Sequence, residues 1–112
     1  MDTMMYPSPD NIRSAPVWEN YLVAQAVQAS LGLIPVNALA VGVRVNGPRV
    51  HLVIQLRHAS THDFEDIDDI RSMLEDLVGP DVSVDVDAQH VQNRLISPLD
   101  GTHWIYLRRI ED

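Results

Sequence analysis

The sequence predicts an α+β domain with the element order α-β-β-α-β-β, an antiparallel sheet, and both helices packed on one face of that sheet. Two stretches repeat apolar residues at the three- and four-residue spacing of an amphipathic helix. Three other stretches alternate apolar and polar residues, as half-buried strands do. The dipeptide Asn46-Gly47 separates two of them and is the strongest short signal for a β-hairpin.

The first helix is predicted at residues 18–31, which contain good helix formers and neither Pro nor Gly. Gly32 and then Pro35 provide a stop signal. Residues 1–16 contain three prolines and are predicted to be an irregular tail, so that residues 17–112 form the single domain. The predicted apolar face of this helix consists of Trp18, Leu22, Ala26 and Ala29.

Two strands are predicted next, at residues 38–46 and 49–57, with valine, leucine and isoleucine alternating along each. Pro48 follows the Asn46-Gly47 pair, and proline cannot donate a ladder hydrogen bond. We therefore expect a hairpin loop slightly longer than two residues.

The clearest helix is predicted at residues 61–78. Ser60 or Thr61 is a suitable N-cap, and the acidic residues that follow complement the positive end of the helix dipole. Gly79-Pro80 ends the helix. Its predicted apolar face consists of Phe64, Ile67, Ile70, Leu74 and Leu77.

The last strands are predicted at residues 82–87 and 103–109, with a short helical turn within 88–98. Trp104 and Tyr106 are expected on one side of the final strand, which leaves apolar residues on its other side as well. A small sheet with helices on one face usually leaves the other face partly exposed to solvent. An apolar second face therefore suggests a covered surface, either a homodimer contact or a partner site.

Composition narrows the function classes. The chain has 112 residues, 46% of them hydrophobic, which is enough for one domain with a real core. Cysteine is absent, so disulfides, thiolate zinc sites and thiol nucleophiles are excluded. No apolar run approaches a membrane span and the N-terminus does not resemble a signal peptide, so a cytoplasmic protein is expected. The net charge of −8 disfavours nucleic acid and anionic membranes as partners.

The negative charge is concentrated between Thr61 and Asp87, where ten carboxylates accompany a single arginine, Arg71. One interpretation is a solvated helix face with dipole complementation in its first turn. However, a helix that is merely soluble usually mixes both signs, because like charges three or four residues apart cost a few tenths of a kcal/mol. The other interpretation is a docking surface for a basic protein.

Catalytic and metal sites have little support in the sequence. No nucleophile elbow, Ser-x-x-Lys motif or glycine-rich phosphate loop is present. The acidic stretch lacks the glycine that an EF-hand loop requires. His58 and His62 are four residues apart, but His58 precedes the predicted N-cap. We therefore expect a protein that is not an enzyme and that uses no metal and no cofactor.

One family resemblance covers about half of the chain. The residues that carry it are YLVAQAVQASLGLIPVNALAVGVRV, VHLVIQL and STHDFEDIDDI, which lie between Asn20 and Ile70, and the closing WIYLRR is similar as well. In this layout of helix, glycine, hairpin and acidic helix, the chain resembles bacterial immunity proteins of polymorphic and contact-dependent growth-inhibition toxin systems. The resemblance implies a small, often acidic protein that blocks a toxin domain, frequently a basic nuclease. It assigns no interface residue.

Two functional hypotheses follow. The first is an immunity protein that neutralises a cognate basic toxin by direct binding, with apolar residues as anchors. The second is a homo-oligomeric accessory or regulatory domain whose sheet face pairs with itself, in which the carboxylates only keep the protein soluble. For the first hypothesis, the candidate partner-binding residues are Asp63, Glu65, Asp66, Asp69, Glu75, Asp76, Asp85 and Asp87.

Overall fold

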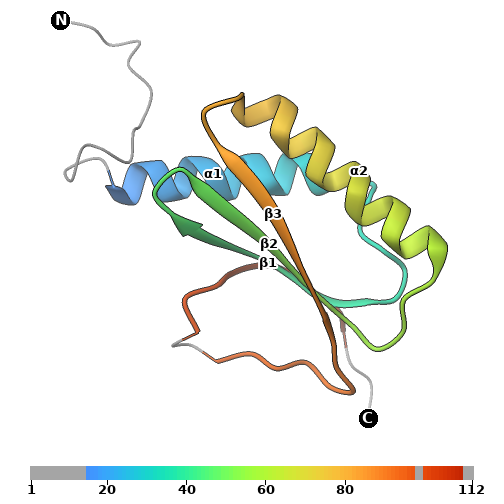
Figure 1. Cartoon of the computed structure of the whole chain (residues 1–112). Coiled ribbons are helices and arrows are strands. Elements are labelled where there is room, and N and C mark those ends of the chain that lie inside the picture. Colours follow the sequence, from blue (N-terminus) through green and yellow to red (C-terminus); the bar gives the residue numbers. More distant parts are fainter. Residues whose placement is uncertain (1–14, 98–99, 110–112) are drawn as a thin grey trace, which may run out of the picture.

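The computed structural model of the chain describes residues 15–97 and 100–109, and every structural statement below refers to these residues. The element order α-β-β-α-β-β is confirmed, and both helices lie on the same face of the sheet (Figure 1). The elements are α1 (Ala15–Ser30), β1 (Ala38–Asn46), β2 (Arg49–Leu56), α2 (Thr61–Val78), β3 (Ser83–His90) and β4 (His103–Leu107).

The sheet has four strands in the order β3-β2-β1-β4. β1 pairs antiparallel with β2 and with β4, whereas β2 and β3 are parallel. The sheet is therefore mixed, and the prediction of a fully antiparallel sheet is wrong for the β2–β3 pair. The reason is the long crossover through α2, which returns the chain to the starting end of β2 before β3 begins, as in a βαβ unit.

Helix α1 begins at Ala15, so Pro16 lies in its first turn and not in the predicted tail of residues 1–16. Proline is tolerated in a first turn because the amide it lacks has no partner there. The rest of that tail, residues 1–14, lies outside the described residues. All four residues of the predicted apolar face are buried: Trp18, Leu22, Ala26 and Ala29.

The β1–β2 hairpin is tighter than predicted. Asn46 pairs directly with Arg49, so the loop consists of only Gly47 and Pro48, and the expectation of a longer loop is wrong. Gly47 has φ 58°, which suits the first central position of a two-residue turn. The Trp18 indole Nε1 donates a 2.8 Å hydrogen bond to the Gly47 carbonyl, which ties the start of α1 to this hairpin.

The main core lies between the two helices and the sheet. Leu22 of α1 and Leu74 of α2 pack there with valine, leucine and isoleucine side chains of β1 and β2. The predicted face of α2 is only partly right, because Phe64 and Leu77 are exposed. Asp63, not Phe64, takes the buried position in the first turn.

The second face of the sheet is covered by the chain itself. β3 and β4 lie at opposite edges, so the segment between them must cross the sheet, and it does so on the side away from the helices (Figure 1). We call its described part, residues 91–97 and 100–102, the strap. Beneath it Val53 is completely buried. The strap contains no helical turn in its described residues, so that prediction within 88–98 is wrong.

Side-chain hydrogen bonds fasten the strap to the sheet. The Gln55 amide binds Leu95 twice: Nε2 donates to the Leu95 carbonyl and Oε1 accepts from the Leu95 amide, both at 2.9 Å. Arg57 Nε donates to the Gln92 carbonyl at 2.9 Å, and Arg44 Nε donates to Thr102 Oγ1 at 2.8 Å. The apolar second face inferred from the sequence is therefore covered within one chain.

The Gln55→Leu variant should loosen the strap without removing apolar volume. The substitution removes both hydrogen bonds to Leu95 and also the 3.2 Å bond from Gln55 Nε2 to Gln89 Oε1 of β3. Losing the two strap bonds, at about 0.5–1.5 kcal/mol each, should increase local opening by roughly 5- to 150-fold. Hydrogen–deuterium exchange at the Val91 amide, which donates to the Leu56 carbonyl at 2.9 Å and does not involve Gln55, measures this opening. The control is Gln92→Leu, because Gln92 contributes only its backbone carbonyl to the strap. Unchanged protection of the Val91 amide in Gln55→Leu would show that these bonds do not hold the strap.

A bulge in the pairing of β4 with β1 changes where the β4 side chains point. Trp104 is opposite Gly42, but Tyr106 is opposite Val41, so Ile105 is an extra residue on β4. Trp104 thus lies over Gly42 on the strap side, where a Cβ on Gly42 would come within 2.8 Å of the Trp104 ring. Tyr106 packs on the helix side against the core. The prediction that Trp104 and Tyr106 share one side is wrong.

Candidate functional site

The outward side of α2 carries a continuous row of carboxylates. Glu65, Asp69 and Asp76 are spaced by four and seven residues, which aligns them along one side of a helix, and all three are exposed. They lie opposite the buried Ile67 and Ile70. Three further carboxylates flank the row and are at least partly exposed. We call the whole set the acidic helix face: Glu65, Asp66, Asp68, Asp69, Glu75 and Asp76.

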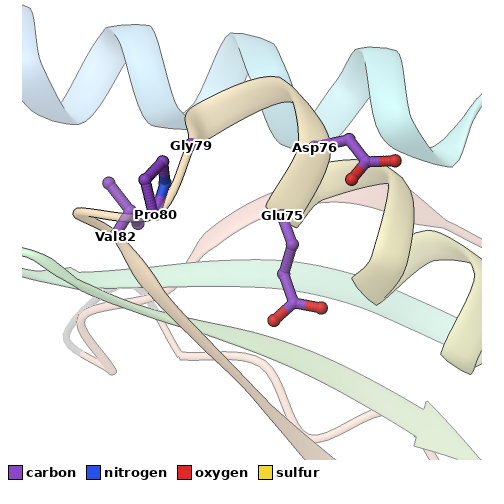
Figure 2. A pocket seen from close by; sticks show the side chains of 5 residues that line it. All are labelled: Glu75, Asp76, Gly79, Pro80 and Val82. Carbon is purple, nitrogen blue, oxygen red and sulfur yellow. The ribbon is translucent and has the colours of Figure 1, made fainter.

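A shallow pocket of about 410 Å³ lies at the C-terminal end of this face (Figure 2), lined by Glu75, Asp76, Gly79, Pro80 and Val82. The last turn of α2 contains no basic residue, so the negative end of the helix dipole is left without a compensating charge. The Glu75 and Asp76 side chains point to different sides of the helix, so they do not converge on a single ion. The pocket suits a cationic side chain lying against the helix end.

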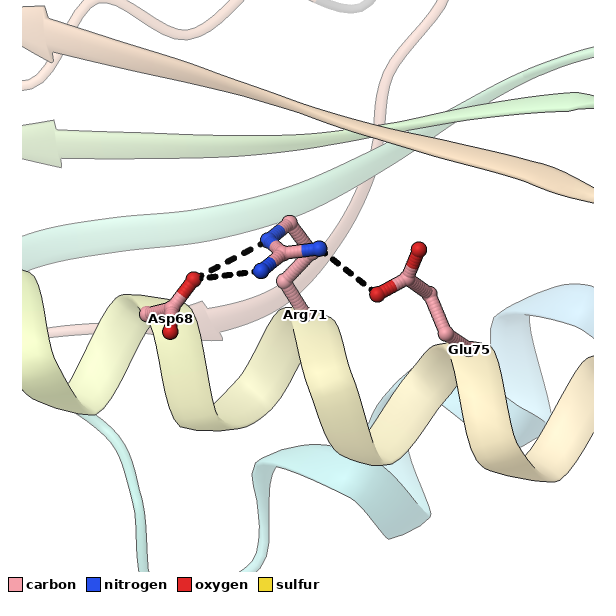
Figure 3. Close-up of polar contacts among 3 residues, drawn as sticks. All are labelled: Asp68, Arg71 and Glu75. Atoms are coloured by element: carbon pink, nitrogen blue, oxygen red, sulfur yellow. Dashed lines mark hydrogen bonds and ion pairs between the residues drawn. The ribbon is translucent and has the colours of Figure 1, made fainter.

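Arg71 is the only arginine on α2, which has no lysine, and it neutralises one flank of the acidic helix face (Figure 3). Its guanidinium contacts Asp68 Oδ1 and Glu75 Oε1, each at 2.6 Å. The hydrogen bond and the charge of Asp68, followed by the charge of Glu75, raise the pKa of Arg71. In the described part of the chain, no arginine pairs with Glu65, Asp69 or Asp76. Glu65 Oε2 has a 3.7 Å contact with Nδ1 of the exposed His62 imidazole. The central row is therefore left without an arginine partner in the described residues.

Asp63 does not belong to this face, although the sequence analysis places it among the partner-binding residues. Its exposed fraction is 1%. The carboxylate accepts hydrogen bonds from the Ser60 amide at 2.8 Å and from Asn37 Nδ2 at 2.6 Å. Ser60 Oγ in turn accepts a hydrogen bond from the Asp63 amide, which completes a capping box. Asp63 therefore has a structural role, since it joins the start of α2 to the loop before β1.

The pKa of the Asp63 carboxyl reflects two opposing effects. Burial raises the pKa, but the hydrogen bonds from Ser60 and Asn37 lower it by more, so that the net pKa lies below the ordinary value of 3.8. The group is ionised at neutral pH. Its negative charge is used inside the protein and is not presented to a partner.

Asp85 and Asp87 also lie apart from the acidic helix face. They pair in register with His51 and Val53 of β2, so their side chains point to the strap side of the sheet, away from α2. Asp87 Oδ2 accepts a 2.9 Å hydrogen bond from Gln89 Nε2. Five of the eight predicted residues are thus brought together on α2, and three are not: Glu65, Asp66, Asp69, Glu75 and Asp76 form the face, whereas Asp63, Asp85 and Asp87 do not.

The apolar part of this surface is not evident from the sequence. Phe64, Met73 and Leu77 are exposed on α2, beside the carboxylates. The helical spacing of Phe64 and Leu77 predicts that both are buried. The burial of Asp63 in the first turn shows that the buried face of α2 is rotated away from these two residues. Surfaces that combine apolar anchors with a charged surround are typical of protein–protein contacts.

Other kinds of site have no counterpart in residues 15–97 and 100–109. No group of three or more histidine and carboxylate side chains there is arranged to hold a metal ion. Within the same residues, no helix has the length and apolar character needed to cross a membrane. Comparison with protein-family models and a search of curated proteins both return no match for this chain. The interpretation of the site therefore rests on its own geometry.

Proposed function

We propose that the protein is an immunity-type inhibitor that neutralises a basic toxin domain by binding it directly through the acidic helix face. The observation that carries this proposal is the clustering of six carboxylates, with a single arginine, on the outward side of one capped helix of 18 residues. A rigid helix presents these charges without the entropic cost of ordering a loop.

The charges and the apolar residues have different roles in this proposal. The carboxylates attract a basic partner and orient it, which raises the association rate more than the lifetime of the complex. Phe64 and Met73 lie next to them and are exposed, so they are the candidate anchors that slow dissociation. The pocket at the end of α2 receives a lysine or arginine side chain of the toxin.

The alternative hypothesis, a homo-oligomer that pairs through its free sheet face, has less support. The strap occupies that face, and both Val53 and Gln55 are buried beneath it. Pairing through the face would require the strap to detach, which would break the hydrogen bonds between Gln55 and Leu95.

Growth protection combined with complex formation tests the proposal. We expect the reading frame adjoining this gene to encode a toxin whose C-terminal domain is basic. Co-expression of the present chain should restore growth, and the purified toxin domain should form a complex with one copy of the chain per toxin. A toxin domain that kills equally well in the presence of the chain, and that does not bind it, would refute the proposal.

A further inference from the structure

The two edges of the sheet differ in how they are protected against pairing. The β3 edge carries Asp85 and Asp87, and like charges on an edge oppose strand addition. The β4 edge has no carboxylate, lysine, arginine or proline within its sequence, His-Trp-Ile-Tyr-Leu, and these are residues of high β propensity. In the described part of the chain, no strand pairs with the outer edge of β4. The five-residue length of β4 and its bulge at Ile105 are the remaining protection of this edge against pairing.

An apolar groove runs beside this same edge on the helix side of the sheet. It has a volume of about 170 Å³ and lies between the end of α1 and β4. Leu31 is 64% exposed in its wall. The bulge in β4 widens the apolar floor, because the consecutive residues Ile105 and Tyr106 both line the groove. Its apolar lining is completed by Val27 and Ile34.

We propose that β4 pairs antiparallel with β4 of a second copy of this chain, across a two-fold axis near Ile105. Such pairing satisfies the outer backbone groups of β4 and joins two four-stranded sheets into one. Because residues opposite each other in antiparallel strands point to the same face, the two apolar grooves meet on the helix side. Leu31 and Val27 of each copy then become buried against the partner.

The charges at the two ends of β4 favour a second copy of the chain as the occupant. Asp100 precedes the strand and is held by hydrogen bonds from the Thr102 amide at 2.9 Å and from Trp104 Nε1 at 3.2 Å. Arg108, whose Nη1 donates a 2.9 Å hydrogen bond to the Val36 carbonyl, and the exposed Arg109 follow the strand directly. Antiparallel pairing about the centre places the acidic start of one strand beside the basic end of the other, twice by symmetry. The edge is therefore complementary to itself in charge as well as in shape.

The strong negative charge of α2 does not oppose this dimer. α2 connects β2 to β3, at the side of the sheet away from β4, and α1 makes the helix contacts to β4. In the dimer the two acidic helix faces therefore lie toward opposite ends of the joined sheet. The dimer also leaves both faces accessible, so this inference does not depend on the proposed toxin binding.

Sedimentation equilibrium of the full chain tests the dimer. The wild-type chain should sediment at twice its monomer mass of 12.6 kDa. The Leu31→Asp variant should weaken dimerisation by at least about tenfold, because it places two like charges in a joined apolar groove. The matched control is Leu95→Asp, because Leu95 has a similar exposed fraction of 66% but lies on the strap. This control should remain dimeric.

Circular dichroism confirms that each variant is folded, and Val27→Asp provides a second variant in the same groove. Two results would overturn the proposal. One is a wild-type chain that remains a 12.6 kDa monomer up to its solubility limit. The other is a wild-type dimer that both groove variants leave intact. Neither result bears on toxin binding, which the Leu31→Asp monomer should retain.

Discussion

Neutralising the central row of the acidic helix face should slow association with the proposed basic partner by roughly 10- to 100-fold. The variant is Glu65→Gln combined with Asp69→Asn and Asp76→Asn. These substitutions keep side-chain shape and remove three charges that no arginine of the described chain neutralises. Stopped-flow or surface-binding kinetics measure the effect, and the dissociation rate should change far less than the association rate.

A matched control separates a local docking face from the effect of total charge. The variant Asp81→Asn, Asp85→Asn, Asp87→Asn also removes three exposed or half-exposed carboxylates, but they lie off α2. We expect it to reduce the association rate by less than about threefold, since its charges contribute only to the overall field. If both triple variants slow association equally, the net charge and not the acidic helix face attracts the partner.

The largest expected effect on stability comes from Asp63→Ala, which should lower the free energy of unfolding by about 2–4 kcal/mol. The substitution removes the reciprocal N-terminal cap of α2, worth about 1 kcal/mol. It also leaves the donors of Asn37 and Ser60 without their acceptor, at about 1–3 kcal/mol. Urea denaturation measures the loss. Asp66→Ala is the control from the next turn of α2, and it should change stability by less than about 0.5 kcal/mol.

The same carboxylate should make stability sensitive to acid. The pKa of Asp63 in the folded protein lies below its ordinary value of 3.8, so its contribution is fully present above that value and is lost as the pH falls through the folded-state pKa. Wild-type stability should therefore fall on acidification below about pH 4 more steeply than that of Asp63→Asn. Equal slopes for the two proteins would contradict the assigned network.

Local signals in the sequence define much of the fold. The helix predicted at residues 61–78 matches α2 at both ends, because Ser60 and Gly79-Pro80 are strong capping and stop signals. The hairpin was predictable from Asn46-Gly47, although its loop is shorter than expected. Each of these features depends on residues close together in the chain, which a sequence pattern can report.

The features that the sequence analysis missed depend on residues far apart in the chain. Alternation predicts a strand at residues 82–87, and β3 extends to His90. The pattern does not indicate which neighbour the strand pairs with or in which direction. The path of the strap depends on β3 and β4 lying at opposite edges. The rotation of α2 depends on Asn37, which offers Asp63 a buried hydrogen bond 26 residues away.

The candidate site could be predicted only in part, because helical spacing depends on nearby residues whereas the placement of a strand depends on distant ones. Helical spacing places Glu65, Asp69 and Asp76 on one side of α2, as it should. Assigning Asp85 to the same patch requires knowing on which side of the sheet α2 packs, and the strand pattern does not contain that information. The ten carboxylates counted between Thr61 and Asp87 therefore overestimate the acidic helix face, which contains six of them.

The association rate measured as a function of ionic strength tests the central claim most directly. For the wild-type chain and the proposed toxin partner, the rate should fall steeply as salt is added, and the Glu65→Gln, Asp69→Asn, Asp76→Asn variant should show a much shallower fall. The two curves should converge at high salt, where the field of the acidic helix face is screened. A wild-type rate that does not change with salt would contradict the claim that these carboxylates guide the partner to α2.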